Sequence, residues 1–139
     1  PTMTFNDIAI RINAYEQTIK TLGNEKVKGQ PLIRELAIGR TKQEAFEVAR
    51  KPLLAKYESY ATWGQTDTKK ERTLSETFEE FCRDRFIIGD EQEVVDEILK
   101  YKESFGVDNL LVRVQWPGLG QGEVLKTLDH LGKIIATVS

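Results

Sequence analysis

Four side chains of this sequence can bind an anion or line a ligand pocket, and each lies near the end of an expected strand. Arg113, Gln115 and Trp116 stand at the end of a run rich in Leu and Val that a Pro-Gly pair stops. A guanidinium there can pair a carboxylate or hold an anionic ligand, and an indole can line an apolar pocket. Arg40 ends a second apolar run and precedes Thr41, at an expected helix start, where free backbone amides favour anions.

These residues also have a structural interpretation. Period-two alternation puts Leu111, Arg113 and Gln115 on one face of their strand, so Arg113 can form an ion pair with an acidic residue such as Glu35. We favour this ion pair over direct ligand contact, because buried arginines are commonly paired. Trp116 either lines a pocket or closes the hydrophobic rim at the strand's end, and both interpretations stay open.

The other reactive residue types predict neither a metal site nor a nucleophile. His130 is the only histidine and has no cysteine or carboxylate at ligand spacing. Cys82, the only cysteine, has no partner base and is interpreted as a packing residue. Thr41 is explained as a helix cap that acts with Glu44, and the glycines of 117–120 do not form a phosphate-binding loop. No catalytic residue can be assigned.

Hydrophobic spacing and capping signals define the elements that hold these residues. Asp90 and Glu93 form a capping box, and Gly106 suits the left-handed end of the helix that follows. Pro52 predicts a kink or break near residues 50–51. Strands are expected near 32–38 and 109–116, and helices over 5–22, 41–63, from Thr73 or Ser75 to about 85, over 90–106, and over 124–138.

Two strands are few for a parallel sheet, which normally has several strands and both faces covered. The segment between them is long enough for a right-handed parallel crossover. The order helix, strand, helices, strand, helix is what about a quarter of a (β/α)8 barrel contains. The sequence therefore predicts a helix-rich α/β fold that is part of a larger TIM-type barrel, with residues 1–139 as one partial domain.

Several stretches together resemble one enzyme family. They are IIGDEQEVVDEI, then Gly-Val-Asp before a strand that carries LLVRVQWPG, then a closing helix with Leu-Gly near its middle. The upstream stretch IRELAIGRTKQEAFEVARKPLLAKYESYATWG is similar to the preceding strand and helix of the same family. The chain resembles the C-terminal end of luciferase-like flavin-dependent monooxygenases, which are (β/α)8 barrels.

This resemblance implies a function for the complete barrel. The family binds reduced flavin, as FMN or in some branches a deazaflavin, and uses O2 to oxidise a small organic substrate. It implies cofactor contacts from Arg113, Gln115 and Trp116, and from Arg40 at the other strand end. Most flavin contacts in the family come from earlier strands, so we expect this segment to be inactive without an N-terminal barrel segment. A flavin reductase is the expected electron-donating partner.

Composition narrows the remaining function classes. The apolar fraction of 40%, the charged fraction of 30% and the net charge of −2 are those of an ordinary globular protein without a nucleic-acid footprint. A single cysteine and the absence of a membrane-length apolar run or secretory signal favour the cytoplasm. The alternative to a barrel fragment is a stand-alone, non-catalytic α/β module. Either one, with open strand edges, is expected to form a homo-oligomer.

Overall fold

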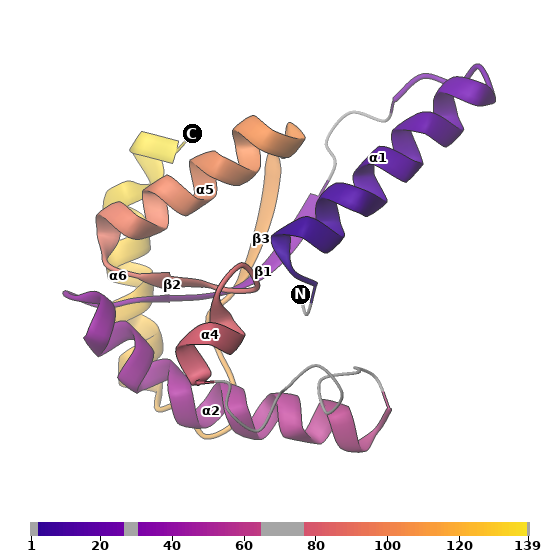
Figure 1. Ribbon diagram of the computed structural model, residues 1–139. Helices are drawn as coiled ribbons and strands as arrows, with labels where there is room; N and C mark the ends of the chain where they lie inside the picture. Colours follow the sequence, from indigo (N-terminus) through magenta and orange to yellow (C-terminus); the bar gives the residue numbers. More distant parts are fainter. Residues whose placement is uncertain (1–2, 27–30, 65–76, 139) are drawn as a thin grey trace.

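The computed structural model describes residues 3–26, 31–64 and 77–138, and its centre is a small parallel sheet (Figure 1). The central strand β1 (Pro31–Ile38) lies between β2 (Ile87–Gly89) and β3 (Asn109–Arg113). The C-terminal half of β1 pairs with β2, and its N-terminal half pairs with β3. The predicted α/β class with parallel strands is confirmed, whereas the count of two strands was wrong.

Two strand boundaries differ from the sequence prediction. β2 was not among the predicted strands, because three residues carry too little pattern to identify a strand without its neighbour. β3 ends at Arg113 and not at Trp116, since the last register pair with β1 is Glu35 with Arg113. Beyond that pair the chain leaves the sheet, and the Trp116 indole becomes buried in the core.

Local signals explain where the helices begin and end. Thr4, Thr77 and Asp90 each form a reciprocal capping box, and Gly106 ends its helix at φ 62°. Thr41 caps its helix by accepting from the Glu44 amide, as predicted, but the box is not reciprocal because the Glu44 carboxylate accepts from the Arg40 backbone amide. The helices are α1 (Phe5–Thr21), α2 (Lys42–Thr62), α4 (Phe78–Cys82), α5 (Glu91–Phe105) and α6 (Gln121–Val138). The predicted caps Thr73 and Ser75 lie outside the described residues.

Of the two outcomes expected at Pro52, a kink or a break, the break does not occur, because α2 continues through this residue. Proline removes one backbone hydrogen bond and crowds the preceding turn. Pro52 itself is buried, and so are Ala49, Leu53 and Tyr57 on the same side of the helix. Burial of this stripe against the sheet outweighs the local cost of the proline.

The sheet separates two hydrophobic cores. On one face, Leu36 and Ile38 of β1 pack with α5, α6 and the start of α1, while the rest of α1 projects away from the body (Figure 1). On the other face, Ala37 packs with α2 and α4. Strand alternation predicts that Leu110, Val112 and Val114 share the face opposite Arg113, and all three pack against the first core.

The predicted buried stripe of α6 was only partly right. Helical spacing predicted a stripe of Val124, Leu128, Leu131, Ile135 and Val138. Val124 is buried and Leu131 and Val138 are half-buried, but Leu128 and Ile135 are exposed, and Ile134, outside the predicted stripe, is buried. The helix therefore also turns large apolar side chains towards solvent. No helix in the described ranges is long and apolar enough to cross a membrane.

Candidate functional site

A fully buried carboxylate, that of Glu35, lies where β1 meets α2 and the end of β3. Four side chains donate hydrogen bonds to it: Lys56 Nζ at 2.7 Å, Tyr57 Oη at 2.9 Å, Trp116 Nε1 at 2.5 Å, and an Arg113 guanidinium nitrogen. We call these five residues the Glu35 cluster. The favoured interpretation of Arg113, an ion pair with Glu35, is confirmed.

The fold brings the Glu35 cluster together from three segments. Glu35 and Arg113 are register partners on adjacent parallel strands, so their side chains leave the sheet on the same face. Lys56 and Tyr57 lie in the second half of α2, the helix that covers this face. Trp116 follows three residues after Arg113 and is only 1% exposed, so its indole fills the space beneath α2.

Burial and hydrogen bonding act in opposite directions on this carboxyl. Burial raises the pKa of Glu35, but the hydrogen bonds from Lys56 and Trp116 and the charge of Lys56 outweigh it, so the pKa lies below its ordinary value. Burial together with the adjacent Glu35 carboxylate raises the pKa of Tyr57 above its ordinary value. At neutral pH the cluster therefore holds an ionised Glu35 and a protonated Tyr57.

The Glu35 cluster carries more positive than negative charge. Lys56 and Arg113 are both cationic and share the single carboxylate of Glu35. The Nε atom of Arg113 is buried and has no hydrogen-bond acceptor among the described residues. An excess of positive charge with an unused donor is the chemistry of a site that accepts an anion or a developing negative charge.

A cavity of about 350 Å³ opens beside the cluster, at the C-terminal end of α2. Lys56, Tyr60, Trp63 and Pro117 line it, so one cation of the cluster also faces an aromatic wall. Helical spacing puts Tyr57, Tyr60 and Trp63 on one stripe of α2, which the sequence alone predicts to be core. Tyr57 is buried, Tyr60 is half-buried and Trp63 is 66% exposed.

The structure places the other predicted site residues apart from the cluster. Gln115 is exposed just beyond β3, and Arg40 is exposed at the start of α2, where it pairs with Glu44 at 3.0 Å. His130 of α6 contacts Glu91 of α5 at 2.6 Å. Among the described residues, no group of three or more metal-binding side chains is gathered.

Sequence reasoning missed two members of the cluster. Lys56 was not considered, and Tyr57 was assigned to the core stripe without a polar partner. One signal could have found them: Glu35 is an acidic residue inside an otherwise apolar strand, and a buried carboxylate needs donors from the covering helix. Helical spacing alone could not show which donors of α2 face it.

Comparison with solved structures finds a fold that matches nearly all of this chain. One such structure is the oxygenating constituent of 3,6-diketocamphane monooxygenase from the CAM plasmid of Pseudomonas putida, a type II Baeyer-Villiger monooxygenase in complex with FMN. The TM-score is 0.67 at 15% identity, over 96% of this chain and 40% of that chain. No model of a protein family matches, and no curated protein does. This chain thus shares the fold of part of a larger flavin-binding enzyme.

The Glu35 cluster fits a flavin on chemical grounds. Reduced flavin carries negative charge on its ring, and the cluster offers two cations for one carboxylate. The buried Nε of Arg113 is a donor that remains to be satisfied. Trp116, in contrast, is enclosed in the core and bonded to Glu35, so its contribution here is to hold the carboxylate.

Proposed function

We propose that this chain is the C-terminal part of a luciferase-like flavin-dependent monooxygenase. Its three strands form one side of a (β/α)8 barrel that an N-terminal segment completes. The observation that carries this proposal is the fold match over 96% of the chain to 40% of a monooxygenase that binds FMN. The family resemblance of the sequence, which covers most of the same residues, supports it independently.

The open surfaces of the sheet also support a missing partner segment. Ile33 and Leu111 are register partners on the face that carries Glu35, and they are 37% and 46% exposed. Helices cover the opposite face over the same stretch. α2 covers the Glu35 face only near Glu35 and Ala37, and the part with Ile33 and Leu111 stays open, as expected where the side chains of other barrel strands would pack. An N-terminal segment would bury Ile33 and Leu111.

The residues of this chain would contribute charge and position to the reaction. Bound reduced flavin would supply the electrons that activate O2 for oxidation of an organic substrate. Arg113 and Lys56 would hold an anionic edge of the flavin or substrate, and Glu35 would fix both cations. Gln115 and Arg40, both exposed at strand ends, would contact ligand only in the complete barrel.

The proposal extends to the partners of the enzyme. FMN is the favoured cofactor because the matching structure holds it, and a deazaflavin is the alternative. Reduced flavin has to be supplied, so a flavin reductase is the proposed partner. We also propose a cytoplasmic location and a homo-oligomeric assembly.

The experiment that tests this function uses the protein made from the native gene. Its intact mass is measured, and FMN and a deazaflavin are titrated by fluorescence. We expect a chain long enough to complete the barrel that binds one flavin saturably, and an Arg113→Gln variant that binds it more weakly. The 139-residue chain alone is expected to bind none. A folded native product that binds neither flavin would refute the proposal.

A further inference from the structure

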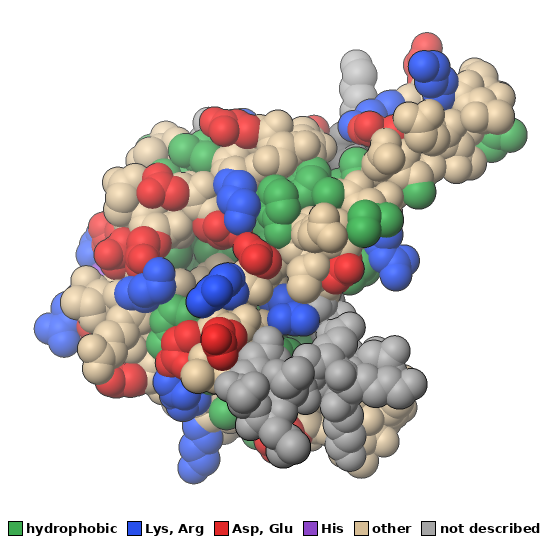
Figure 2. Space-filling model, viewed as in Figure 1, with side chains coloured by type: hydrophobic (Ala, Val, Ile, Leu, Met, Phe, Trp, Pro, Cys, Tyr) green, Lys and Arg blue, Asp and Glu red, His purple; other side chains and the backbone are tan. Residues whose placement is uncertain are grey.

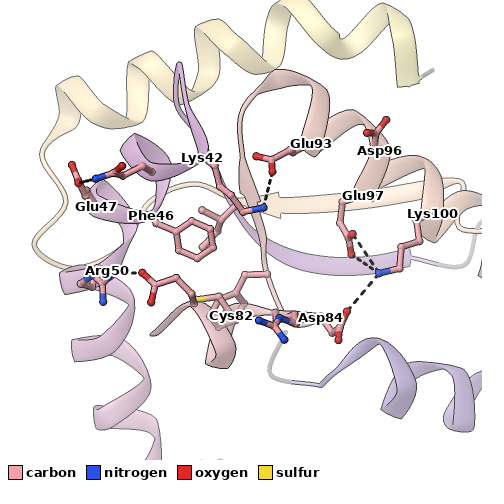
Figure 3. Close-up of a pocket in the computed structure, with 15 residues that line it drawn as sticks. Lys42, Phe46, Glu47, Arg50, Cys82, Asp84, Glu93, Asp96, Glu97 and Lys100 are labelled. Carbon is pink, nitrogen blue, oxygen red and sulfur yellow. Dashed lines mark hydrogen bonds and ion pairs between the residues drawn. The ribbon is translucent and has the colours of Figure 1, made fainter. Parts of the chain in front are cut away.

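A second cavity, of about 850 Å³, lies between α2, α4 and α5 at the outer edge of β2 (Figure 3). Its floor is apolar and consists of Phe46 from α2, Cys82 from α4, and Phe86 and Ile88 at β2. Cavities of about 300–1,000 Å³ with mostly apolar walls are typical of small-molecule sites. This cavity has the size and the floor of a ligand site.

Salt bridges between different elements surround the apolar floor (Figure 3). They are Lys42–Glu93 at 2.6 Å, Arg50–Glu79, and Lys100–Asp84 at 3.6 Å. The first joins α2 to α5, and the second joins α2 to α4. These three cations are therefore already neutralised by carboxylates, and an anionic ligand would have to displace one of them.

The rim has more carboxylates than cations. Six acidic residues line the cavity against four basic ones, and the surface between α5 and α2 shows both kinds gathered around a small apolar area (Figure 2). Glu47 and Asp96 have no cationic partner among the described residues. Each accepts only from a glutamine amide, Gln43 at 2.9 Å and Gln92 at 2.8 Å respectively.

We propose that this cavity binds an apolar molecule that carries a positively charged amino group. The apolar body covers Phe46, Phe86 and Ile88, and its burial supplies most of the affinity. The ammonium group remains at the rim, where Glu47 of α2 or Asp96 of α5 accepts its hydrogen bonds. The site is separate from the Glu35 cluster and shares no residue with it. This inference does not depend on flavin binding.

Three fluorescent probes with one apolar body and different charges test the proposal. They are dansylcadaverine, which is cationic, dansylamide, which is neutral, and dansylglycine, which is anionic. Each is titrated into the 139-residue chain at low salt. We expect saturable binding of dansylcadaverine about tenfold tighter than that of dansylglycine, a difference that decreases as salt is added. Equal affinities for the three probes, or no saturable binding, would overturn the proposal.

A double variant and a control variant test whether the cationic probe binds in this cavity. Glu47→Gln combined with Asp96→Asn removes the two free carboxylates but keeps their size, so the preference for dansylcadaverine should disappear while dansylamide binds as before. Asp129→Asn is the matched control, because Asp129 is exposed on α6 and does not line the cavity. If the double variant keeps the preference, the cationic probe binds elsewhere and the assignment is wrong.

Discussion

Inside the core, four donors from α2 and from the end of β3 meet the Glu35 carboxylate. Glu35→Gln removes its negative charge and leaves Lys56 and Arg113 side by side without a counter-ion. Removing one partner of a buried ion pair is much costlier than removing an exposed one, so we expect the free energy of unfolding to fall by about 3–5 kcal/mol. Urea denaturation at neutral pH, followed by circular dichroism, measures the change.

Glu44→Gln is the control for this experiment. It is the same substitution at a half-buried glutamate that pairs with an exposed arginine, Arg40, of the same segment, so the urea midpoint should change far less. If Glu35→Gln unfolds at the same urea concentration as the unsubstituted chain, the Glu35 cluster does not hold α2 on the sheet. The role we assign to Glu35 would then be wrong.

The pH dependence of stability is a second prediction at this residue. The pKa of Glu35 is lower in the folded chain than its ordinary value of 4.5, so the ionised carboxylate stabilises the fold fully above that value. As pH falls through 4.5 towards the folded pKa, this contribution is lost. The stability difference between the unsubstituted chain and Glu35→Gln should therefore shrink between about pH 7 and about pH 3. A difference that stays constant would contradict the lowered pKa.

The pairing of Arg113 with Glu35 could be predicted because strand alternation fixes which side chains share a face. Lys56 and Tyr57 could not be placed in the same way, since their approach to Glu35 depends on how α2 crosses the sheet. The sequence could not decide whether Trp116 lines a pocket or closes the hydrophobic rim, for a similar reason. Its position depends on where β3 leaves β1, and only the register of the two strands determines that.

At the scale of helices, replacing glycine by alanine is expected to have opposite effects on stability at two positions. Gly106 ends α5 at φ 62°, where a side chain is strained, so Gly106→Ala should destabilise the fold by about 1–2 kcal/mol. Gly132 lies inside α6, where alanine is the better helix former, so Gly132→Ala should stabilise by about 1 kcal/mol. An added Cβ meets no atom within 4 Å at either position, so neither effect involves packing.

Thermal and urea unfolding of the two glycine variants, measured side by side, test these signs. Each variant is the control for the other, since both add one methyl group to an exposed position. Two shifts in the same direction would show that backbone conformation does not decide the outcome. In that case the assignment of Gly106 as a left-handed helix end would have to be abandoned.

Helix boundaries could be predicted where their cause is local. The box of Asp90 with Glu93 and the glycine at 106 set both ends of α5, and both act within a few residues. β2 could not be predicted, because its three residues become a strand only through pairing with β1. The break expected at Pro52 does not occur for the opposite reason. The local preference of proline to end a helix is overridden by burial of the helix stripe around it.

At the scale of the whole molecule, two apolar surfaces remain uncovered among the described residues. One is the sheet face with Ile33 and Leu111, next to the open edge of β3. The other is the face of α6 that carries Leu125 and Leu128. A strand edge adds unpaired backbone amides and carbonyls to its apolar surface, and a helix face does not. The sheet is therefore the stronger site of association.

We expect the 139-residue chain to self-associate through the sheet, and Leu111→Lys to reduce this association strongly. A lysine directed inward beside an open edge prevents a second strand from pairing, because its charge would be buried. Sedimentation velocity over a range of concentrations measures the effect.

Leu125→Lys on α6 is the matched control, since Leu125 is 53% exposed and Leu111 is 46% exposed. If Leu125→Lys alone yields monomers, the interface lies on α6. If the chain is monomeric at every concentration, its exposed sheet face is stable in water without another protein segment packed on it. That result would weaken the case for a missing barrel segment.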